Sequence, residues 1–159
     1  MSVRIIVDST ADVSASILPR LEVVPLTVHF GDEEYIDGIT IDHKTFYEKL
    51  VETDIHPTTS QAAPSAFAAE YEKAKQAGES AIVITLSSNF SGTYQSAVIA
   101  AQEYENIYVI DCESVAIGGG ILVELALQLI EQGMETQDIV KHIEEANKNI
   151  IIVALVDTL

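Results

Sequence analysis

The sequence is poor in cysteine and in basic residues. Its single cysteine, Cys112, excludes an internal disulfide and leaves no cysteine cluster for a structural zinc ion. Only 8 lysines and arginines stand against 25 aspartates and glutamates, which gives a formal net charge of −17 over 159 residues. Such an acidic surface repels phosphate backbones and anionic membranes, so the sequence argues against nucleic-acid binding. Asp8 and Asp12 are a conceivable metal pair, but two carboxylates in a turn more often cap backbone N–H groups.

The sequence also lacks long apolar runs. No stretch approaches the length of a transmembrane helix, and the amino terminus has no signal-peptide pattern. The hydrophobic fraction is nevertheless 48%, enough for a buried core, and the length suits one domain. We therefore expect a single globular, cytoplasmic domain over residues 1–159.

Familiar catalytic motifs are missing as well. There is no GxSxG nucleophile elbow, no phosphate-binding GxxxxGK loop, and no GxGxxG after the first strand. Of the four histidines, only His56 lies in a candidate ligand loop, where it could activate Ser91. A serine-dependent hydrolase or acyl transferase using Ser91 and His56 is therefore an alternative function, although a solvent-facing His56 is the simpler interpretation.

Apolar runs alternate with helical patterns along most of the chain. This order predicts an α/β fold, with a mostly parallel sheet and helices on both of its faces. Pro25 should place its strand at an edge of the sheet, because proline removes a ladder donor. The expected strands are 3–7, 23–30, 81–85, 107–110 and 150–156, with a short hairpin arm at 35–38. The expected helices are a short one from Ser14 to Leu18, then 43–52 capped by Asp42, 66–76, 94–104, 115–130, and 137–147 capped by Thr136.

Three consecutive glycines, Gly118 to Gly120, fall inside one expected helix. Each costs about 1 kcal/mol relative to alanine in a helix. That cost indicates a close approach by a neighbouring helix, a backbone segment or a ligand chain, and helix packing is the simplest of these.

Two loops are rich in hydroxyl groups. Leu86 to Ala97 reads LSSNFSGTYQSA and joins an apolar strand to a helix, where free N–H groups and the helix dipole favour an anion. The loop from His56 to Ser65 contains the sequence TTSQ at Thr58 to Gln61. Serine and threonine donate hydrogen bonds to a carboxylate without adding charge. Two converging loops of this kind would hold one carboxyl group.

These motifs resemble the amino-terminal domain of the DegV family. The matching segments are DSTAD at 8–12, a PxxxxF-like strand at 25–30, TTSQ at 58–61 and LSSxxSGTYQSA at 86–97, and their order agrees over all 159 residues. One departure is that the family often has proline directly after the glutamine, whereas Ala62 and Ala63 intervene here before Pro64.

The resemblance implies a non-catalytic fatty-acid-binding protein without cofactor or metal. Its ligand would be a long-chain fatty acid such as palmitate, presented to a separate fatty-acid kinase whose product feeds phospholipid synthesis. By position, Thr59 and Ser91 would contact the carboxyl group, with Ser60 and Gly92 as secondary candidates. Because family members have two domains, the chain is expected to be the first of them.

The acyl chain should dominate affinity. Burying about fourteen methylenes at ~0.8 kcal/mol each gives roughly 11 kcal/mol before the costs of binding. Ile117 to Leu122 and Phe90 are the expected walls of the acyl tunnel. A further alternative is a module with an empty site, whose exposed apolar surface makes it self-associate.

Overall fold

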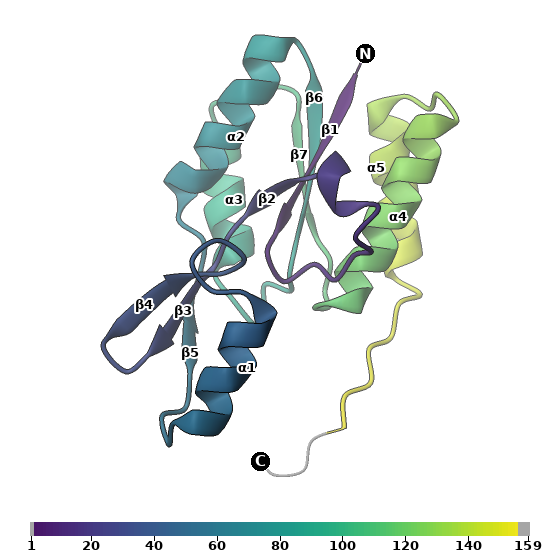
Figure 1. The fold of residues 1–159 in the computed structure, drawn as a ribbon. Helices are drawn as coiled ribbons and strands as arrows, with labels where there is room; N and C mark the ends of the chain where they lie inside the picture. The colour runs from purple at the N-terminus through teal and green to yellow at the C-terminus, as the bar shows by residue number, and fades with distance from the viewer. Residues whose placement is uncertain (1, 156–159) are drawn as a thin grey trace.

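The computed structural model describes residues 2–155 of the chain, and an α/β layer structure organises most of them (Figure 1). A four-stranded sheet has the order β2-β1-β6-β7, and every neighbouring pair in it is parallel. Its strands are β1 (Val3–Asp8), β2 (Glu22–Val24), β6 (Ser80–Thr85) and β7 (Ile107–Asp111). The predicted fold class is confirmed.

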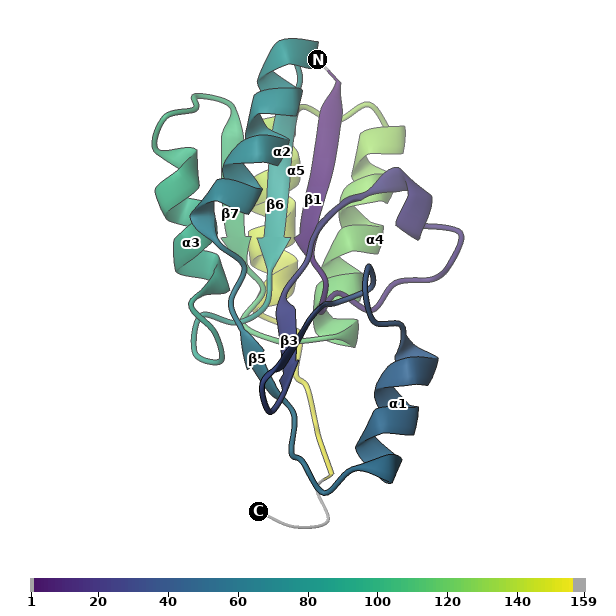
Figure 2. The same cartoon turned by 60° about the vertical axis from the view of Figure 1, so that its left-hand side comes forward.

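Helices cover both faces of this sheet (Figures 1 and 2). They are α2 (Pro64–Ala77) and α3 (Thr93–Ala101) on one face, and α4 (Ile117–Glu131) and α5 (Thr136–Asn147) on the other. Side chains alternate along β1, so Ile5 and Val7 join the core under α4 and α5, whereas Ile6 joins the core under α2 and α3. The two cores bury all of β6 and residues 5–8 of β1, which explains the apolar runs in both strands.

A second, smaller sheet lies beyond the carboxyl ends of the parallel strands (Figure 2). Its order is β4-β3-β5 and both pairs are antiparallel. It comprises β3 (Thr27–Phe30), β4 (Glu33–Ile36) and β5 (Thr58–Ser60), with α1 (His43–Glu52) packed beside it through Phe46. The Asp42 carboxylate accepts a hydrogen bond of 2.7 Å from the Thr45 N–H, as the predicted cap of α1.

Four expectations about elements are wrong. The expected strand 23–30 is two strands in different sheets, because the chain turns at Pro25 and Leu26. No helix runs from Ser14. Instead a 3₁₀ turn spans Leu18–Arg20, with Pro19 in its first positions, where its missing N–H is harmless. The Thr136 side chain does not cap α5, whose N-cap is Glu135.

The fourth wrong expectation is the final strand. Residues 150–155 form no strand and are mostly exposed, and residue 156 lies outside the described residues. Within residues 2–155, no helix is long and apolar enough to cross a membrane.

Candidate ligand-binding site

Asp8 ties together the loops that follow β1 and β6. It is only 1% exposed. One carboxylate oxygen accepts hydrogen bonds from the Thr10 N–H and hydroxyl, at 2.9 and 2.6 Å, and the other accepts one of 2.6 Å from the Leu86 N–H. Burial raises the pKa of Asp8, although these hydrogen bonds oppose the shift. The pairing of β1 with β6 thus continues into their loops through one buried carboxyl group.

A second carboxylate holds the other side of the 86–92 loop. Asp111, at the end of β7, accepts hydrogen bonds of 3.2 Å from the Ser88 N–H. Within the loop, the Ser87 carbonyl accepts from the N–H groups of Phe90 and Ser91. Most amide donors of the loop are therefore used internally, so it is the hydroxyl groups and the first turn of α3 that can face a ligand.

Ser91 and Thr93 form a hydroxyl pair at the start of α3. Their oxygens lie 2.9 Å apart, and the Thr93 N–H donates to Ser91 Oγ at 3.2 Å. The Ala62 N–H in turn donates to Thr93 Oγ1 at 3.3 Å. This connects the two hydroxyl-rich segments directly.

Gln61 makes a second connection between the same segments. Its side-chain amide donates to Ser96 Oγ in α3 at 3.0 Å. A methyl group added to Gly92 would overlap the Gln61 side-chain carbonyl oxygen. Gly92 thus leaves room for the Gln61 side chain, a local contact that the sequence did not reveal.

The predicted carboxyl contacts lie on either side of this junction. Thr59 is exposed in β5 opposite Val28, and no hydrogen bond of its hydroxyl is found among residues 2–155. The hydroxyl of Ser60 is 2.8 Å from His29 Nε2. No hydrogen bond joins Thr59 to Ser91 directly, so a shared ligand would have to bridge them.

The structure does not pair the two residues that the hydrolase alternative requires, His56 and Ser91. Across residues 2–155, no hydrogen bond links His56 to Ser91, and the hydroxyl partner of Ser91 is Thr93. Burial raises the pKa of the Cys112 thiol to about 11, which keeps that thiol protonated at neutral pH. No group of three or more metal-ligating side chains occurs in the same range, and the Asp8 carboxylate accepts from the Thr10 N–H, as the capping interpretation expected for that residue.

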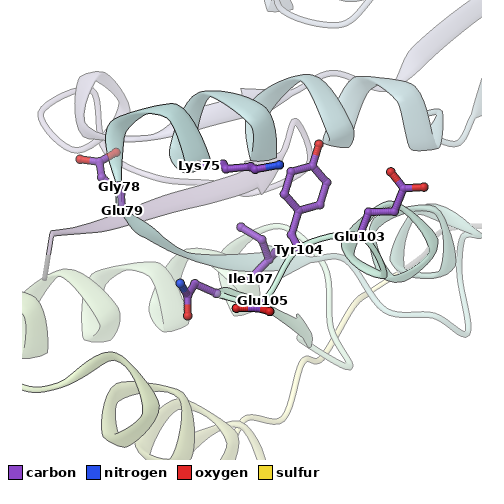
Figure 3. Close-up of a pocket in the computed structure, with 8 residues that line it drawn as sticks. Lys75, Gly78, Glu79, Glu103, Tyr104, Glu105 and Ile107 are labelled. Atoms are coloured by element: carbon purple, nitrogen blue, oxygen red, sulfur yellow. The ribbon is translucent and has the colours of Figure 1, made fainter.

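Two clefts flank the parallel sheet at opposite ends. A cleft of about 440 Å³ lies at the amino-terminal ends of β6 and β7, where Lys75 lies over the Tyr104 ring and glutamates surround them (Figure 3). The other, of about 510 Å³, lies at the carboxyl end of β1, and we call it the β1 cleft. It is lined by residues 7–13, Leu18, Val23, Pro25, residues 37–39, His43 and Ala116. In open α/β sheets ligands bind at the carboxyl ends, which favours the second location.

Two of the predicted tunnel walls, Phe90 and Ile117, are exposed side chains. Phe90 is 66% exposed and Ile117 is 60% exposed, and neither lines the β1 cleft. Ala116 does line it, and takes the unusual backbone angles φ 52° and ψ −114° just before α4. That conformation could not be predicted from the residue type, because alanine rarely adopts positive φ.

Comparison with known proteins agrees with the motifs. The sequence model of the DegV family, described as uncharacterised proteins, matches residues 2–159. A DegV domain-containing protein of Clostridium perfringens is 39% identical over 152 residues, covering 93% of this chain and 54% of its own length.

Solved structures show the same fold. DegV from Bacillus subtilis, a fatty acid binding protein, is 34% identical, with a TM-score of 0.85 over 93% of this chain and 54% of that one. A stearic acid-binding protein from Eubacterium ventriosum is 26% identical, with a TM-score of 0.82 over 91% of this chain and 52% of that one. The chain thus spans about half the length of the relatives it matches, and it belongs to the DegV family.

Proposed function

We propose that this chain binds a long-chain fatty acid such as palmitate by its carboxyl group and presents it to a separate fatty-acid kinase. The kinase would phosphorylate the carboxyl group, and the product would enter phospholipid synthesis. In this proposal the chain is a cytoplasmic carrier without catalysis of its own. It acts as the first of two domains, consistent with relatives of about twice its length.

The hydroxyl pair at the start of α3 carries this proposal. Thr93 Oγ1 accepts from the Ala62 N–H and lies 2.9 Å from Ser91 Oγ, a contact in which either hydroxyl can donate. Ser91 Oγ also accepts from the Thr93 N–H. When Thr93 donates to Ser91, the Ser91 hydroxyl proton is free to point outward to a ligand. A chain of hydrogen bonds polarises the hydroxyl at its end. A carboxylate accepts from such a hydroxyl more strongly than an uncharged group does, because the acceptor carries the charge.

Thr59 supplies the second donor from the other segment. Its hydroxyl has no partner among the described residues, whereas Ser60 is already bonded to His29. Side chains of Thr59 and Ser60 point to opposite faces of β5. Thr59 is therefore the better candidate of the two, and Gly92, the other secondary candidate, also leaves room for the Gln61 side chain.

The local charge favours a ligand with one carboxylate over a more highly charged anion. The hydroxyl donors are neutral, and Asp8 and Asp111 lie behind the loop. A phosphate group would have no lysine or arginine to balance its charge here, because neither type occurs in the 58–61 or 86–97 segments.

Apolar side chains are exposed, including Ile39, Ile117 and Ile121, and they also lead us to propose that the chain self-associates at high concentration.

Alanine substitution of the two hydroxyl residues tests the assignment. We expect Ser91→Ala and Thr59→Ala each to weaken fatty-acid binding about tenfold to a hundredfold, since a hydrogen bond to a charged group contributes roughly 1.5–3 kcal/mol. Isothermal titration with palmitate measures affinity, and mass spectrometry of the purified protein identifies any acid already bound. Addition of a fatty-acid kinase and ATP then measures acyl phosphate formation.

Ser88→Ala and Thr58→Ala are matched controls from the same two segments. Both residues are exposed, and the hydroxyl of Ser88 has no bond within the described part of the chain. The controls should retain affinity and turnover. Unchanged binding and turnover in the Ser91→Ala, Thr59→Ala double variant would show that the carboxyl group is held elsewhere. Ester hydrolysis by the chain alone, blocked by a serine-directed inhibitor, would instead support the enzyme alternative.

A further inference from the structure

The two hydroxyl groups of the proposed carboxyl site belong to separate parts of the fold. Thr59 lies in β5 of the small sheet, whereas Ser91 lies just before α3, which covers one face of the large sheet (Figure 2). β5 pairs with β3 on one side, and no β-ladder within residues 2–155 joins the two sheets. The spacing between Thr59 and Ser91 must therefore be fixed by contacts other than strand pairing.

Gln61 makes such a contact two positions after Thr59. Its side-chain amide donates to Ser96 Oγ at 3.0 Å, and Ser96 is only 2% exposed on α3. The next residue makes a second contact, because the Ala62 N–H donates to Thr93 Oγ1 at 3.3 Å. The bond from Gln61 is the shorter of the two, and it reaches a buried hydroxyl group. Gln61 thus makes the closer connection between the end of β5 and α3.

Gly92 leaves the space in which the Gln61 side chain lies along α3. A methyl group added to Gly92 would overlap the Gln61 side-chain carbonyl oxygen and lie 2.8 Å from Gln61 Cδ. The backbone angles of Gly92, φ −73° and ψ 3°, are ones that alanine adopts readily. An alanine at this position would therefore act by pushing aside the end of the Gln61 side chain, which would then leave Ser96.

We infer that Gln61 is a positioning residue of the carboxyl site. Through Ser96 it holds the end of β5 against α3, and this sets the spacing at which Thr59 and Ser91 meet one carboxylate. The inference rests on the proposed function, because it assumes that these two hydroxyl groups hold the carboxyl group. Two donors bind one carboxylate well only when both are held in place. Loosening β5 should therefore weaken the contact with the head group and leave contacts with the acyl chain unchanged.

Gln61→Ala tests this role. Competition against a fluorescent fatty acid measures the dissociation constants of tetradecanoic acid and of 1-tetradecanol, which has the same chain length but no carboxylate. We expect Gln61→Ala to weaken binding of the acid about threefold to tenfold, and binding of the alcohol less than about twofold. A general structural defect would weaken the binding of both ligands equally.

Gly92→Ala and the double variant Gln61→Ala, Gly92→Ala separate action through Gln61 from direct contact with the ligand. Alone, Gly92→Ala should weaken acid binding about as much as Gln61→Ala, because both break the bond to Ser96. The double variant should bind no more weakly than Gln61→Ala, since the shortened side chain leaves room for the methyl group. Losses that multiply, to about tenfold to a hundredfold, would contradict the inferred route through Gln61.

Gln76→Ala is the matched control, because Gln76 also donates a side-chain hydrogen bond of 3.0 Å, to Glu72 on α2. It should leave both dissociation constants unchanged. Thermal unfolding shows whether each variant is folded, and Ser96→Ala, which removes the acceptor, replaces any variant that is not. Unchanged acid binding in folded Gln61→Ala would overturn the inference, and so would equal losses for the acid and the alcohol.

The proposed function and the inference fail in different ways. A wild-type chain that binds no fatty acid contradicts both. Weaker acid binding in Ser91→Ala and Thr59→Ala, with none in Gln61→Ala, contradicts the inference alone. Weaker binding in all three variants that is confined to the acid supports both.

Discussion

At the scale of single residues, Asp8 is the polar group on which most of the site geometry depends. Its two oxygens accept three hydrogen bonds from two loops while 1% of the residue is exposed. A buried carboxylate of this kind is costly to ionise, and burial is the main reason that its pKa is raised. It contrasts with Asp42, whose pKa is lowered by the hydrogen bonds it accepts from Thr45 at the start of α1.

The raised pKa predicts the sign of a pH effect on stability. Above its folded-state pKa, Asp8 is ionised in both states, and the folded state bears the burial cost. As the pH falls through that pKa toward the ordinary value of 3.8, the folded chain takes up the proton first, so this residue contributes more stability. Asp8→Asn replaces the titrating carboxyl group of Asp8 with an amide that does not titrate. The free energy of unfolding of the wild type minus that of Asp8→Asn should therefore increase as the pH falls from 7 to 4.5.

Urea unfolding at several pH values measures this difference. Subtracting the variant cancels residues such as Asp42, whose lowered pKa makes stability fall with acidification. Asp8→Ala should be destabilised at every pH by about 2–4 kcal/mol, because it leaves buried N–H groups without an acceptor. A difference between wild type and Asp8→Asn that is flat, or that shrinks on acidification, would contradict the proposed burial effect.

At the scale of elements, the glycines of α4 are explained by the turn after β1. A methyl group on Gly120 would overlap the carbonyl oxygen of Asp12, so the partner in the close approach is a backbone segment and not a neighbouring helix. Gly118 faces the buried hydroxyl of Ser114 in the same way. Gly119 has room, because its added methyl would lie 3.9 Å from Cys112 Sγ.

Adjacent alanine substitutions in α4 should therefore have opposite effects. Gly119→Ala should stabilise the chain by up to about 1 kcal/mol through helix propensity. Gly120→Ala should destabilise it by about 1–3 kcal/mol, because the rigid Asp12 backbone must move away from the helix. Urea unfolding at neutral pH compares the two variants. Equal effects of both substitutions would mean that the Asp12 carbonyl is not in contact with α4.

Helices and strands with strong apolar patterns could be predicted from the sequence. Strands that exist only because they pair with another segment could not. β1 and β6 are buried on both faces, so their apolar runs are unambiguous. β5 consists of three exposed polar residues, and only its pairing with β3 makes it a strand. The division between β2 and β3 depends on Leu26, whose N–H bonds to Ser9 across a gap of 17 residues.

In the candidate site, too, some features could be predicted from the sequence pattern, and others depend on tertiary contacts. Sequence alone identified both hydroxyl-rich segments, because serine and threonine cluster there. It did not show that Gln61 contacts Gly92 and Ser96, or that Ala62 bonds to Thr93, since such contacts depend on how α3 is placed beside β5. Nor did it indicate the β1 cleft, whose apolar residues are scattered between Val7 and Ala116.

At the scale of the whole molecule, negative charge is largely uncompensated. Seven of the eight basic side chains form ion pairs with carboxylates, and Lys75 lies over the Tyr104 ring instead. With 25 acidic residues against 8 basic ones in the sequence, carboxylates outnumber side-chain cations about three to one. Their mutual repulsion favours the expanded, unfolded chain and also keeps separate molecules apart.

Salt should consequently stabilise this protein. Raising sodium chloride from 0.01 to 1 M shortens the screening length from about 30 to about 3 Å. Screening weakens exposed ion pairs too, but each of these is worth only about 0–1 kcal/mol. We expect a net gain of about 1 kcal/mol, seen as a rise of roughly 2–4 °C in the thermal midpoint. Scanning calorimetry at pH 7.5 measures it, with light scattering to detect association of the exposed apolar side chains.

The acidity of the sequence provides the control for this effect. Near pH 4.3, the sequence isoelectric point, the net charge is close to zero and there is little repulsion left to screen. The salt-induced rise should therefore shrink strongly between pH 7.5 and pH 4.3. A rise of the same size at both pH values would come from general salting-out of apolar surface, which does not depend on charge, and would contradict an electrostatic origin. A fall at pH 7.5 would mean that the eight ion pairs outweigh the repulsion among the remaining carboxylates.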